Sequence, residues 1–221
     1  MTESGISTSD RMVEVAGHLF AERGFGAVST REIAKAASVN LSAISYHFDN
    51  KEGLYRAVFE KIIRDLKPLR RDLALLLEHR LASADSNHMA YADIIREFIS
   101  RLIGETLPSE GRWRIRLILR EIDKPGECFP VIMEGHINVV HDLLVILLAR
   151  YRGEASTQET IRLEASAILM FCLQQGAGLA VIKARLGWQE IGPEEAQKVK
   201  DAAIRLVLGS LGLPRPAPFP K

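Results

Sequence analysis

One stretch constrains the fold of this chain more than any other, residues 29–54, with the sequence STREIAKAASVNLSAISYHFDNKEGL. Ser29 stands three residues before Glu32, which is the spacing of a capping box at the start of a helix. Asn40, a preferred N-cap residue, precedes a second helical pattern. The stretch therefore predicts two short helices joined by a tight turn, a helix-turn-helix.

The second helix of this pair has the composition of a helix that enters the major groove of DNA. Leu41, Ile44 and Phe48 recur at helical spacing and form one apolar stripe, whereas Ser42 and Ser45 lie away from it. Small hydroxyl-bearing side chains leave the helix backbone free to approach base edges. The pattern therefore favours duplex DNA as the partner.

The same residues resemble the DNA-binding signature of the TetR family of transcriptional regulators. That signature is a Thr-opened helix, a short turn, a recognition helix that ends in an aromatic-His-Phe triplet, and a Lys that opens the next helix. The matching positions are Thr30, Ile33, Ala34, Val39, Ile44, Tyr46, His47, Phe48, Lys51 and Leu54. The alternative is a pair of helices in an unrelated all-α domain, and so many matches at fixed spacing argue against it.

The resemblance also implies which side chains contact DNA. The residues expected to face base edges are Arg31, Leu41, Ser42 and Ala43. The residues expected to face phosphates are Thr30, Ser45, Tyr46, His47 and Lys51. Many members carry Tyr at the position of Ser45, so Tyr46 or His47 is expected to supply that phosphate contact. The chemistry agrees, because Arg binds guanine bidentately and a Lys at a helix N-terminus reaches a phosphate; packing in the turn is the alternative role for Tyr46 and His47.

The charge of the chain argues against unspecific binding along nucleic acid. The 221 residues have a formal net charge of +1, and residues 1–60 contain six Lys or Arg against eight Asp or Glu. DNA binding would then depend on a few placed donors rather than on bulk charge.

An enzyme is a different class of protein to consider. The chain has no Gly-rich phosphate loop, no HExxH and no GxSxG. Cys128, His136 and His141 come nearest to a cluster, but the two histidines are five residues apart and do not share a helix face. We therefore predict no catalytic residues and no metal site; an all-α small-molecule-binding protein or enzyme is the alternative.

The remaining sequence predicts an all-α fold, with an N-terminal three-helix helix-turn-helix domain and a larger C-terminal helical bundle of the TetR type. Apolar residues recur at helical spacing in residues 9–24, 54–66, 69–80, 89–103, 112–122, 128–151, 165–182 and 192–211. The predicted division is a DNA-binding domain (1–50), a connecting helix (51–67), a ligand-binding and dimerisation domain (68–213) and a Pro-rich tail (214–221).

Two consecutive helical segments, at about 128–151 and 157–186, are apolar on more than one side. Such helices must be covered all round, which predicts a homodimer built through them. A membrane span is the alternative, and the adjacent Gln174 and Gln175 argue against it. A symmetric dimer presents two recognition helices, so the operator is expected to be palindromic, with half-sites about 10 bp or a multiple apart.

Residues 113–211 show a weaker likeness, to the CecR-like subgroup of the same family. The likeness rests on Arg120-Glu121, Lys124-Pro125, His136, Gln174, the run from Arg185 to Trp188, and Pro193-Glu194. It implies a pocket for a small-molecule effector in the C-terminal domain and no cofactor. The candidate lining residues are Trp113, Arg116, Arg120, Phe129, Met133, His136, His141, Met170, Phe171, Cys172 and Gln174, each with core packing as its alternative.

Together these features predict a ligand-responsive transcriptional regulator that most simply represses by occupying a promoter, with activation as the alternative. The candidate pocket residues predict a mostly apolar or aromatic effector with one polar or acidic handle. Two widely separated cysteines and the absence of a secretion signal fit the cytoplasm.

Overall fold

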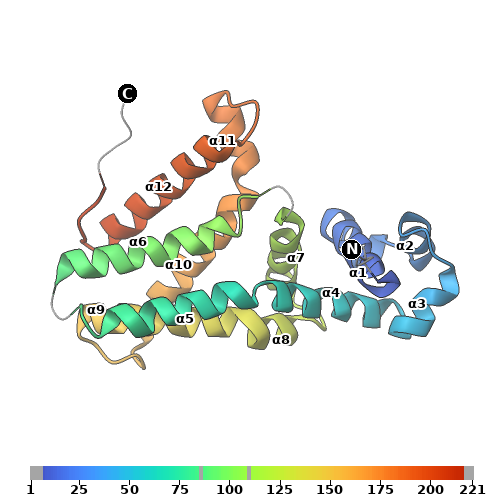
Figure 1. Cartoon of the computed structure of the whole chain (residues 1–221), viewed down its shortest axis with the longest axis horizontal. Coiled ribbons are helices and arrows are strands. Elements are labelled where there is room, and N and C mark those ends of the chain that lie inside the picture. Colours follow the sequence, from blue (N-terminus) through green and yellow to red (C-terminus); the bar gives the residue numbers. More distant parts are fainter. Residues whose placement is uncertain (1–6, 85–86, 109–110, 217–221) are drawn as a thin grey trace, which may run out of the picture. The chain divides into compact units, whose positions relative to one another are not determined.

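The computed structural model describes residues 7–84, 87–108 and 111–216, and within these ranges the chain is helical without strands (Figure 1). The predicted all-α fold class is confirmed. In chain order the helices are α1 (Thr8–Arg23), the 3-10 turn η1 (Phe25–Ala27), α2 (Thr30–Ala36), α3 (Leu41–Phe48), α4 (Lys51–Asp65), α5 (Lys67–Leu81), α6 (His88–Gly104), α7 (Arg112–Asp123), α8 (Phe129–Ile132), the π-helical turn η2 (Met133–Ile137), α9 (Asn138–Arg152), α10 (Glu159–Ala177), α11 (Leu179–Leu186) and α12 (Pro193–Ser210).

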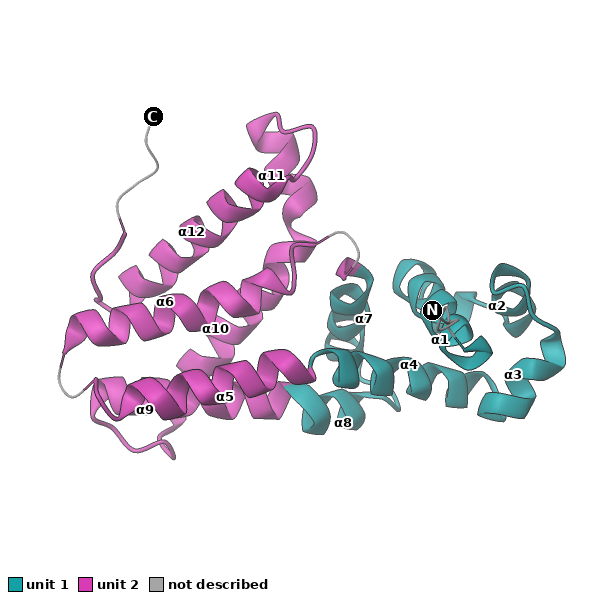
Figure 2. Ribbon diagram, in the orientation of Figure 1, with its two compact units in different colours: residues 1–66, 113–136 teal, residues 67–112, 137–221 magenta. Residues whose placement is uncertain are grey.

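The helices form two compact units (Figure 2). Unit 1 comprises residues 1–66 and 113–136, and unit 2 comprises residues 67–112 and 137–221. The sequence predicted domain boundaries at residues 50, 67 and 213. Those boundaries separate expected functions, whereas the two units are defined by contacts, so the predicted domains stay a prediction. Most of the predicted tail, residues 217–221, lies outside the described residues.

In unit 1, α1 packs on α2 and α4, and α3 packs on α2 and α4. Ser7 caps the start of α1 by accepting a hydrogen bond from the Asp10 N–H, and Gly24 ends the helix with a φ of 83°, a conformation that favours glycine. The core holds fully buried Phe20, Ile33, Ile44, Leu54 and Phe59. This core holds the two helices of the helix-turn-helix at a fixed angle.

Helix α7 belongs to the same unit as the N-terminal helices. A Cβ atom at Gly17 of α1 would lie 2.4 Å from the Trp113 ring, so this glycine permits the contact. Arg120 donates from Nε to the Ala21 carbonyl and from Nη2 to the Glu22 carbonyl, at 3.1 Å each. These carbonyls lie in the last turn of α1, where intrahelical partners are missing, so Arg120 caps that helix.

The loop after α7 is fixed by the buried Glu121 carboxylate. It accepts hydrogen bonds from the Tyr55 hydroxyl (2.9 Å), the Gly126 N–H (2.9 Å) and the Cys128 N–H (3.1 Å). Burial, reinforced by the neighbouring Glu121 charge, raises the pKa of Tyr55 well above its usual value, so the phenol keeps the proton that it donates. The bond ties α4 to the end of α7.

In unit 2, α6 packs against α5, α10 and α12, and α9 packs against α5 and α10. Tyr91 donates to the Arg150 carbonyl (3.2 Å) and Tyr151 to the Leu211 carbonyl (2.8 Å), which ties α9 to its neighbours. By length and composition, Phe129–Arg152 is apolar enough for a membrane span, and 44% of the tested window is buried by the chain itself. Most of its large apolar side chains are buried, and Val139 and Ile146 are exposed.

Of the two long helices predicted in this region, the first runs continuously from Phe129 to Arg152 and the second is broken. The segment predicted over 128–151 contains the π-helical turn η2, and the segment predicted at 157–186 is broken at Gly178 into α10 and α11, which meet at 61°. Glycine disfavours a continuous helix, and Gly176 permits a close approach, because a Cβ there would lie 2.0 Å from the Thr106 carbonyl oxygen.

Candidate nucleic-acid interface

The predicted capping box at the start of α2 is present. The Ser29 N–H donates to Glu32 Oε2 at 2.8 Å, and the Glu32 N–H donates to Ser29 Oγ at 3.3 Å. Arg23 adds an ion pair to the other carboxylate oxygen at 2.9 Å. The hydrogen bonds from Ser29, with a smaller contribution from Arg23, lower the pKa of Glu32 to about 2. Helix α2 therefore begins at a fixed residue.

The turn between α2 and α3 depends on Ser38, whose φ of 54° lies in the left-handed region. The Val39 N–H then donates to the Ala34 carbonyl at 2.9 Å, which closes the turn. Asn40 occupies the N-cap position as predicted, but its side chain makes no capping hydrogen bond. The Ala43 N–H donates to the Asn40 carbonyl at 3.0 Å, and no side chain caps the N–H groups before it, so an outside acceptor such as a phosphate could bind there.

Helix α3 buries one side and exposes the other. Ile44 is fully buried and Phe48 is half-buried, as the predicted stripe requires. Leu41 differs, because 44% of it is exposed, so it does not join the core. Tyr46 is 85% exposed, the largest exposure among the large hydrophobic side chains of the described residues.

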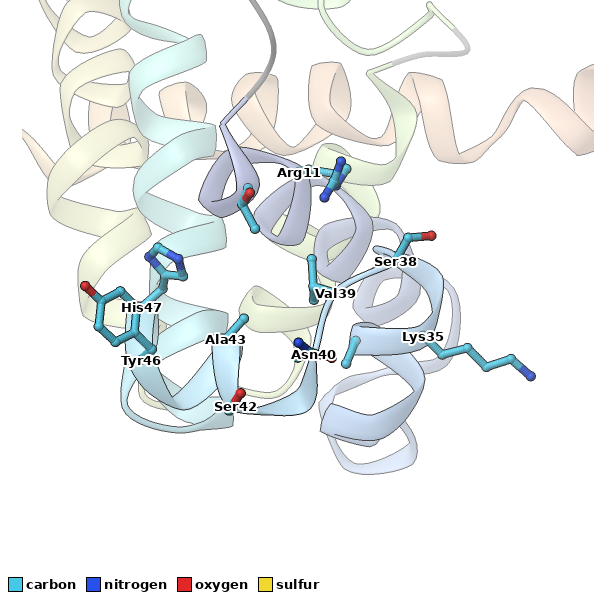
Figure 3. A pocket seen from close by; sticks show the side chains of 11 residues that line it. Arg11, Lys35, Ser38, Val39, Asn40, Ser42, Ala43, Tyr46 and His47 are labelled. Carbon is cyan, nitrogen blue, oxygen red and sulfur yellow. The ribbon is translucent and has the colours of Figure 1, made fainter.

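A hollow of about 780 Å³ opens beside α3 (Figure 3). Tyr46 and His47 lie together on one side of it, with ring centroids 5.0 Å apart and nearly perpendicular, while Lys35 extends away from it on the other. Its lining residues are Thr8, Arg11, Ala34, Lys35, Ser38, Val39, Asn40, Ser42, Ala43, Tyr46 and His47. Four of the predicted DNA contacts therefore line one concave surface of the helix-turn-helix.

The sequence reasoning missed Thr8, Arg11, Lys35 and Asn40 as members of this surface. Arg11 and Lys35 are both exposed, and no acidic side chain lines the hollow. The net charge of residues 1–60 is negative and gave no sign of a positive surface. Arg11 and Lys35 come to one surface only because α1 packs against α2.

The other predicted contacts also reach solvent but do not line the hollow. Arg31, Leu41 and Ser45 are exposed, and Thr30 and Lys51 are partly exposed. Arg31 has no hydrogen-bond or ion-pair partner within the described part of the chain, so its guanidinium is available to a base.

Lys51, at the start of α4, is positioned by an aromatic ring. Its ammonium lies 4.2 Å from the centroid of the Phe25 ring, a cation–π contact. Two residues on, Gly53 lets α4 approach α3, because a Cβ there would lie 2.0 Å from the Phe48 carbonyl oxygen. The Asn50 side chain caps the helix by accepting from the Gly53 N–H at 2.7 Å. The end of α3 and the start of α4 therefore form one rigid corner.

The predicted effector residues are divided between the two units. Trp113, Arg116, Arg120, Phe129, Met133 and His136 belong to unit 1, and His141, Met170, Phe171, Cys172 and Gln174 belong to unit 2. Neither unit alone brings all eleven together.

Several of these residues have roles in packing. Trp113 and Arg120 hold α1, as described above. His141 joins α9 to α10, with Nε2 3.1 Å from both the Arg162 carbonyl and Ser166 Oγ. Burial raises the pKa of Cys172 to about 12, so its thiol keeps its proton and is a poor nucleophile. Within the described residues, no group of three or more His, Cys, Asp or Glu side chains could hold a metal ion.

The fold and this surface define a DNA-binding regulator of the helix-turn-helix class. Residues 13–58 match the family of bacterial regulatory proteins called the tetR family, and residues 88–212 match the C-terminal domain of the HTH-type transcriptional dual regulator CecR. The chain belongs to the TetR family of transcriptional regulators and has a CecR-type C-terminal domain.

Individual relatives agree with this assignment. The chain is 26% identical over 214 residues to the dual regulator CecR of Shigella flexneri, covering 96% of each chain. It superposes on AibR, solved with isovaleryl coenzyme A and operator DNA, with a TM-score of 0.63 and 16% identity over 90% of this chain and 97% of that one. HlyIIR, a hemolysin II transcriptional regulator, gives a TM-score of 0.59 and 23% identity over 88% and 96%. These structures show the shared fold, and the sequence relative is a transcriptional regulator rather than an enzyme.

Proposed function

We propose that this chain is a ligand-responsive repressor that binds a palindromic operator as a homodimer. The observation that carries the proposal is the outward face of α3, whose serines, Tyr46 and His47 face solvent from a packed helix-turn-helix with a capping box on its first helix. The AibR structure supports it, because that protein of the same fold holds operator DNA together with a small molecule.

In this proposal α3 enters the major groove. Arg31, Leu41, Ser42 and Ala43 contact base edges, and Thr30, Ser45, Tyr46, His47 and Lys51 contact phosphates. All nine side chains are at least partly exposed. Arg11 and Lys35 extend the positive surface to phosphates that flank the site.

The dimer in this proposal forms through α9 and α10. Exposed Val139 (40%) and Ile146 (49%) are seven residues apart on one face of α9. On α10, Leu163 is 61% exposed and shares a face with exposed Ala167. Burying these side chains against a second copy would remove them from water, at about 25 cal/mol per Å² of apolar area. Small residues such as Ala167 let the helices approach closely.

The effector in this proposal is a mostly apolar or aromatic small molecule held by residues 68–213, and the protein acts in the cytoplasm. It binds best to a conformer whose two recognition helices are wrongly spaced for the operator, and so releases DNA. The residues predicted for this pocket stay candidates for it.

Activation is the second candidate, and a specific observation favours it. The relative that matches 96% of this chain is a dual regulator. A promoter fusion in which the operator either overlaps or precedes the promoter separates the two outcomes, because a repressor lowers expression from the overlapping site and an activator raises it from the upstream site.

The proposal is tested by selecting bound duplexes from a random pool with the full-length protein. We expect an inverted repeat with half-sites about 10 bp or a multiple apart. Compounds are then screened for release of the selected duplex. A protein that is monomeric and shows no preference among duplexes at low ionic strength would refute the proposal.

A further inference from the structure

A second hollow lies within unit 1 and shares no lining residue with the hollow beside α3. Its volume is about 560 Å³, inside the range of roughly 300–1,000 Å³ typical of small-molecule sites. Its walls come from the end of α1, the first turns of α4 and the end of α7 with the following loop. The lining residues are Gly24, Phe25, Gly26, Glu52, Tyr55, Arg120, Glu121, Asp123, Lys124, Pro125, Gly126 and Glu127. Arg120 is the only predicted effector residue among them.

One wall of this hollow is aromatic. The rings of Phe25 and Tyr55 lie 4.9 Å apart, tilted by 56°, and both side chains are half-buried, so part of each ring surface remains accessible. Phe25 already attracts one cation, the Lys51 ammonium at 4.2 Å. The π-electrons of such rings favour positive charge over negative charge.

Some charged side chains around the hollow have hydrogen-bond partners and others have none. Glu121 is saturated by its three hydrogen bonds, and Arg120 is engaged with the carbonyls of α1. Glu52, Asp123 and Glu127 are exposed and have neither a hydrogen-bond nor an ion-pair partner to their side chains within the described residues. Of the two cations that line the hollow, Lys124 likewise has no such partner in the described part of the chain. The charged side chains of the lining that have no partner are therefore mainly acidic.

We propose that this hollow is a binding site for a lipophilic cation, an organic molecule with an aromatic body and a positively charged nitrogen or phosphorus centre. The aromatic body stacks on Phe25 and Tyr55, and the charge lies towards Glu52, Asp123 and Glu127. Any effect of this ligand on operator binding rests on the function proposed above, because Phe25 also positions Lys51. The binding itself does not depend on it.

The test uses two probes of the same shape and opposite charge, tetraphenylphosphonium and tetraphenylborate. Each is titrated into the full-length protein by calorimetry without DNA, so a failure to bind any operator would not affect the result. We expect tetraphenylphosphonium to bind at least about tenfold more tightly than tetraphenylborate, and more weakly as salt is added.

Two variants assign the binding to this hollow. Gly26→Phe adds a large side chain to the lining of the hollow without a clash at its base, because Gly26 lines the hollow and a Cβ there has no atom within 4 Å. This variant should lose tetraphenylphosphonium binding while its circular dichroism and melting temperature stay as in the wild type. The triple variant Glu52→Gln, Asp123→Asn, Glu127→Gln should lower the affinity by about tenfold.

The matched control changes the same net charge at exposed carboxylates of unit 2, through Glu78→Gln, Glu154→Gln, Glu190→Gln. It should bind tetraphenylphosphonium as the wild type does. The proposal is overturned if the wild type binds neither probe, if it binds both equally, or if the triple variant in the hollow behaves like the control. Wild-type binding by a folded Gly26→Phe variant would also overturn it.

Discussion

Two helices of this chain, α3 in unit 1 and α10 in unit 2, differ in their most exposed large hydrophobic side chain, which is Tyr46 (85%) on α3 and Leu163 (61%) on α10. On α3 the exposed side chains include Ser42, Ser45, Tyr46 and His47, all of which can form hydrogen bonds with water. On α10 they include Leu163, which is 61% exposed and cannot. The two helices therefore differ in what they require of a partner.

The difference indicates which partner each helix meets. A hydrated, hydroxyl-rich face is stable alone and can exchange its waters for phosphate and base edges. An exposed leucine gains about 1.5–3 kcal/mol when it is fully buried, which favours a permanent protein partner. This difference supports the proposal that α3 makes the reversible DNA contact and α10 the lasting contact between subunits.

The largest expected effect comes from a charge placed on the apolar face. Leu163→Glu should convert the proposed dimer into a monomer, because a carboxylate would be buried in its interface. Operator affinity should then fall by at least about a hundredfold, since a single recognition helix loses the gain from bivalent binding. Sedimentation velocity measures the first effect and fluorescence anisotropy with operator DNA the second.

Leu206→Glu is the matched control, because Leu206 of α12 is similarly exposed, at 64%, and lies outside the proposed interface. It should remain a dimer with unchanged operator affinity. A Leu163→Glu protein that sediments as a dimer would show that α10 is not the interface. The exposed leucine of α10 would then no longer indicate a protein partner.

The next effect concerns the polar side of the comparison. Arg31→Ala should lose about 1–3 kcal/mol of binding to the selected operator and almost nothing on a scrambled duplex. Lys51→Ala should weaken both duplexes alike and reduce the salt slope by about one. Equal losses on both duplexes for Arg31→Ala would remove it from the residues that read sequence. Thermal melting of Lys51→Ala is the control for its lost contact with Phe25.

The elements that local sequence signals define could be predicted well. Three helix ends could be predicted because capping acts over three or four residues. They are the capping box of Ser29 with Glu32, the end of α1 at Gly24 and the start of α4 at Lys51. Periodicity misplaced Leu41, because its place in the apolar stripe gave it the same pattern as Ile44, whereas the family resemblance had already placed it on the side that faces DNA. Periodicity finds a helix face but does not say what covers it.

Contacts between distant segments could not be predicted. Arg120 caps α1 from about a hundred residues further along the chain, and no local sequence pattern predicts its contact with that helix. An arginine and Trp113 among apolar residues indicated a pocket, whereas the structure gives both of them contacts with α1. The hollow lined by Phe25, Tyr55 and Glu127 arises from three separate segments for the same reason.

A smaller effect is expected from the corner that presents α3. Gly53→Ala should destabilise the protein by about 1–2 kcal/mol, because the new methyl group meets the Phe48 carbonyl and this cost exceeds the usual helical gain of alanine. Operator affinity should fall while the dimer persists. Gly104→Ala is the control, since a Cβ there has no atom within 4 Å, and it should match or exceed the wild-type melting temperature. A Gly53→Ala protein as stable as this control would contradict the proposed close packing.

The smallest effect tests the capping box that fixes α2, the helix before α3. Hydrogen bonds from Ser29 lower the pKa of Glu32 from 4.5 to about 2, so its carboxylate stabilises the folded state above pH 4.5. That contribution is lost as the pH falls from about 4.5 towards 2. Comparison with Glu32→Gln isolates it from the other carboxylates, because the variant has no charge to lose at this position. The difference in melting temperature between the two proteins should be constant from pH 7 to 5 and shrink below pH 4.5. A difference that stays constant down to pH 2.5 would show that the Glu32 charge contributes nothing to the start of α2.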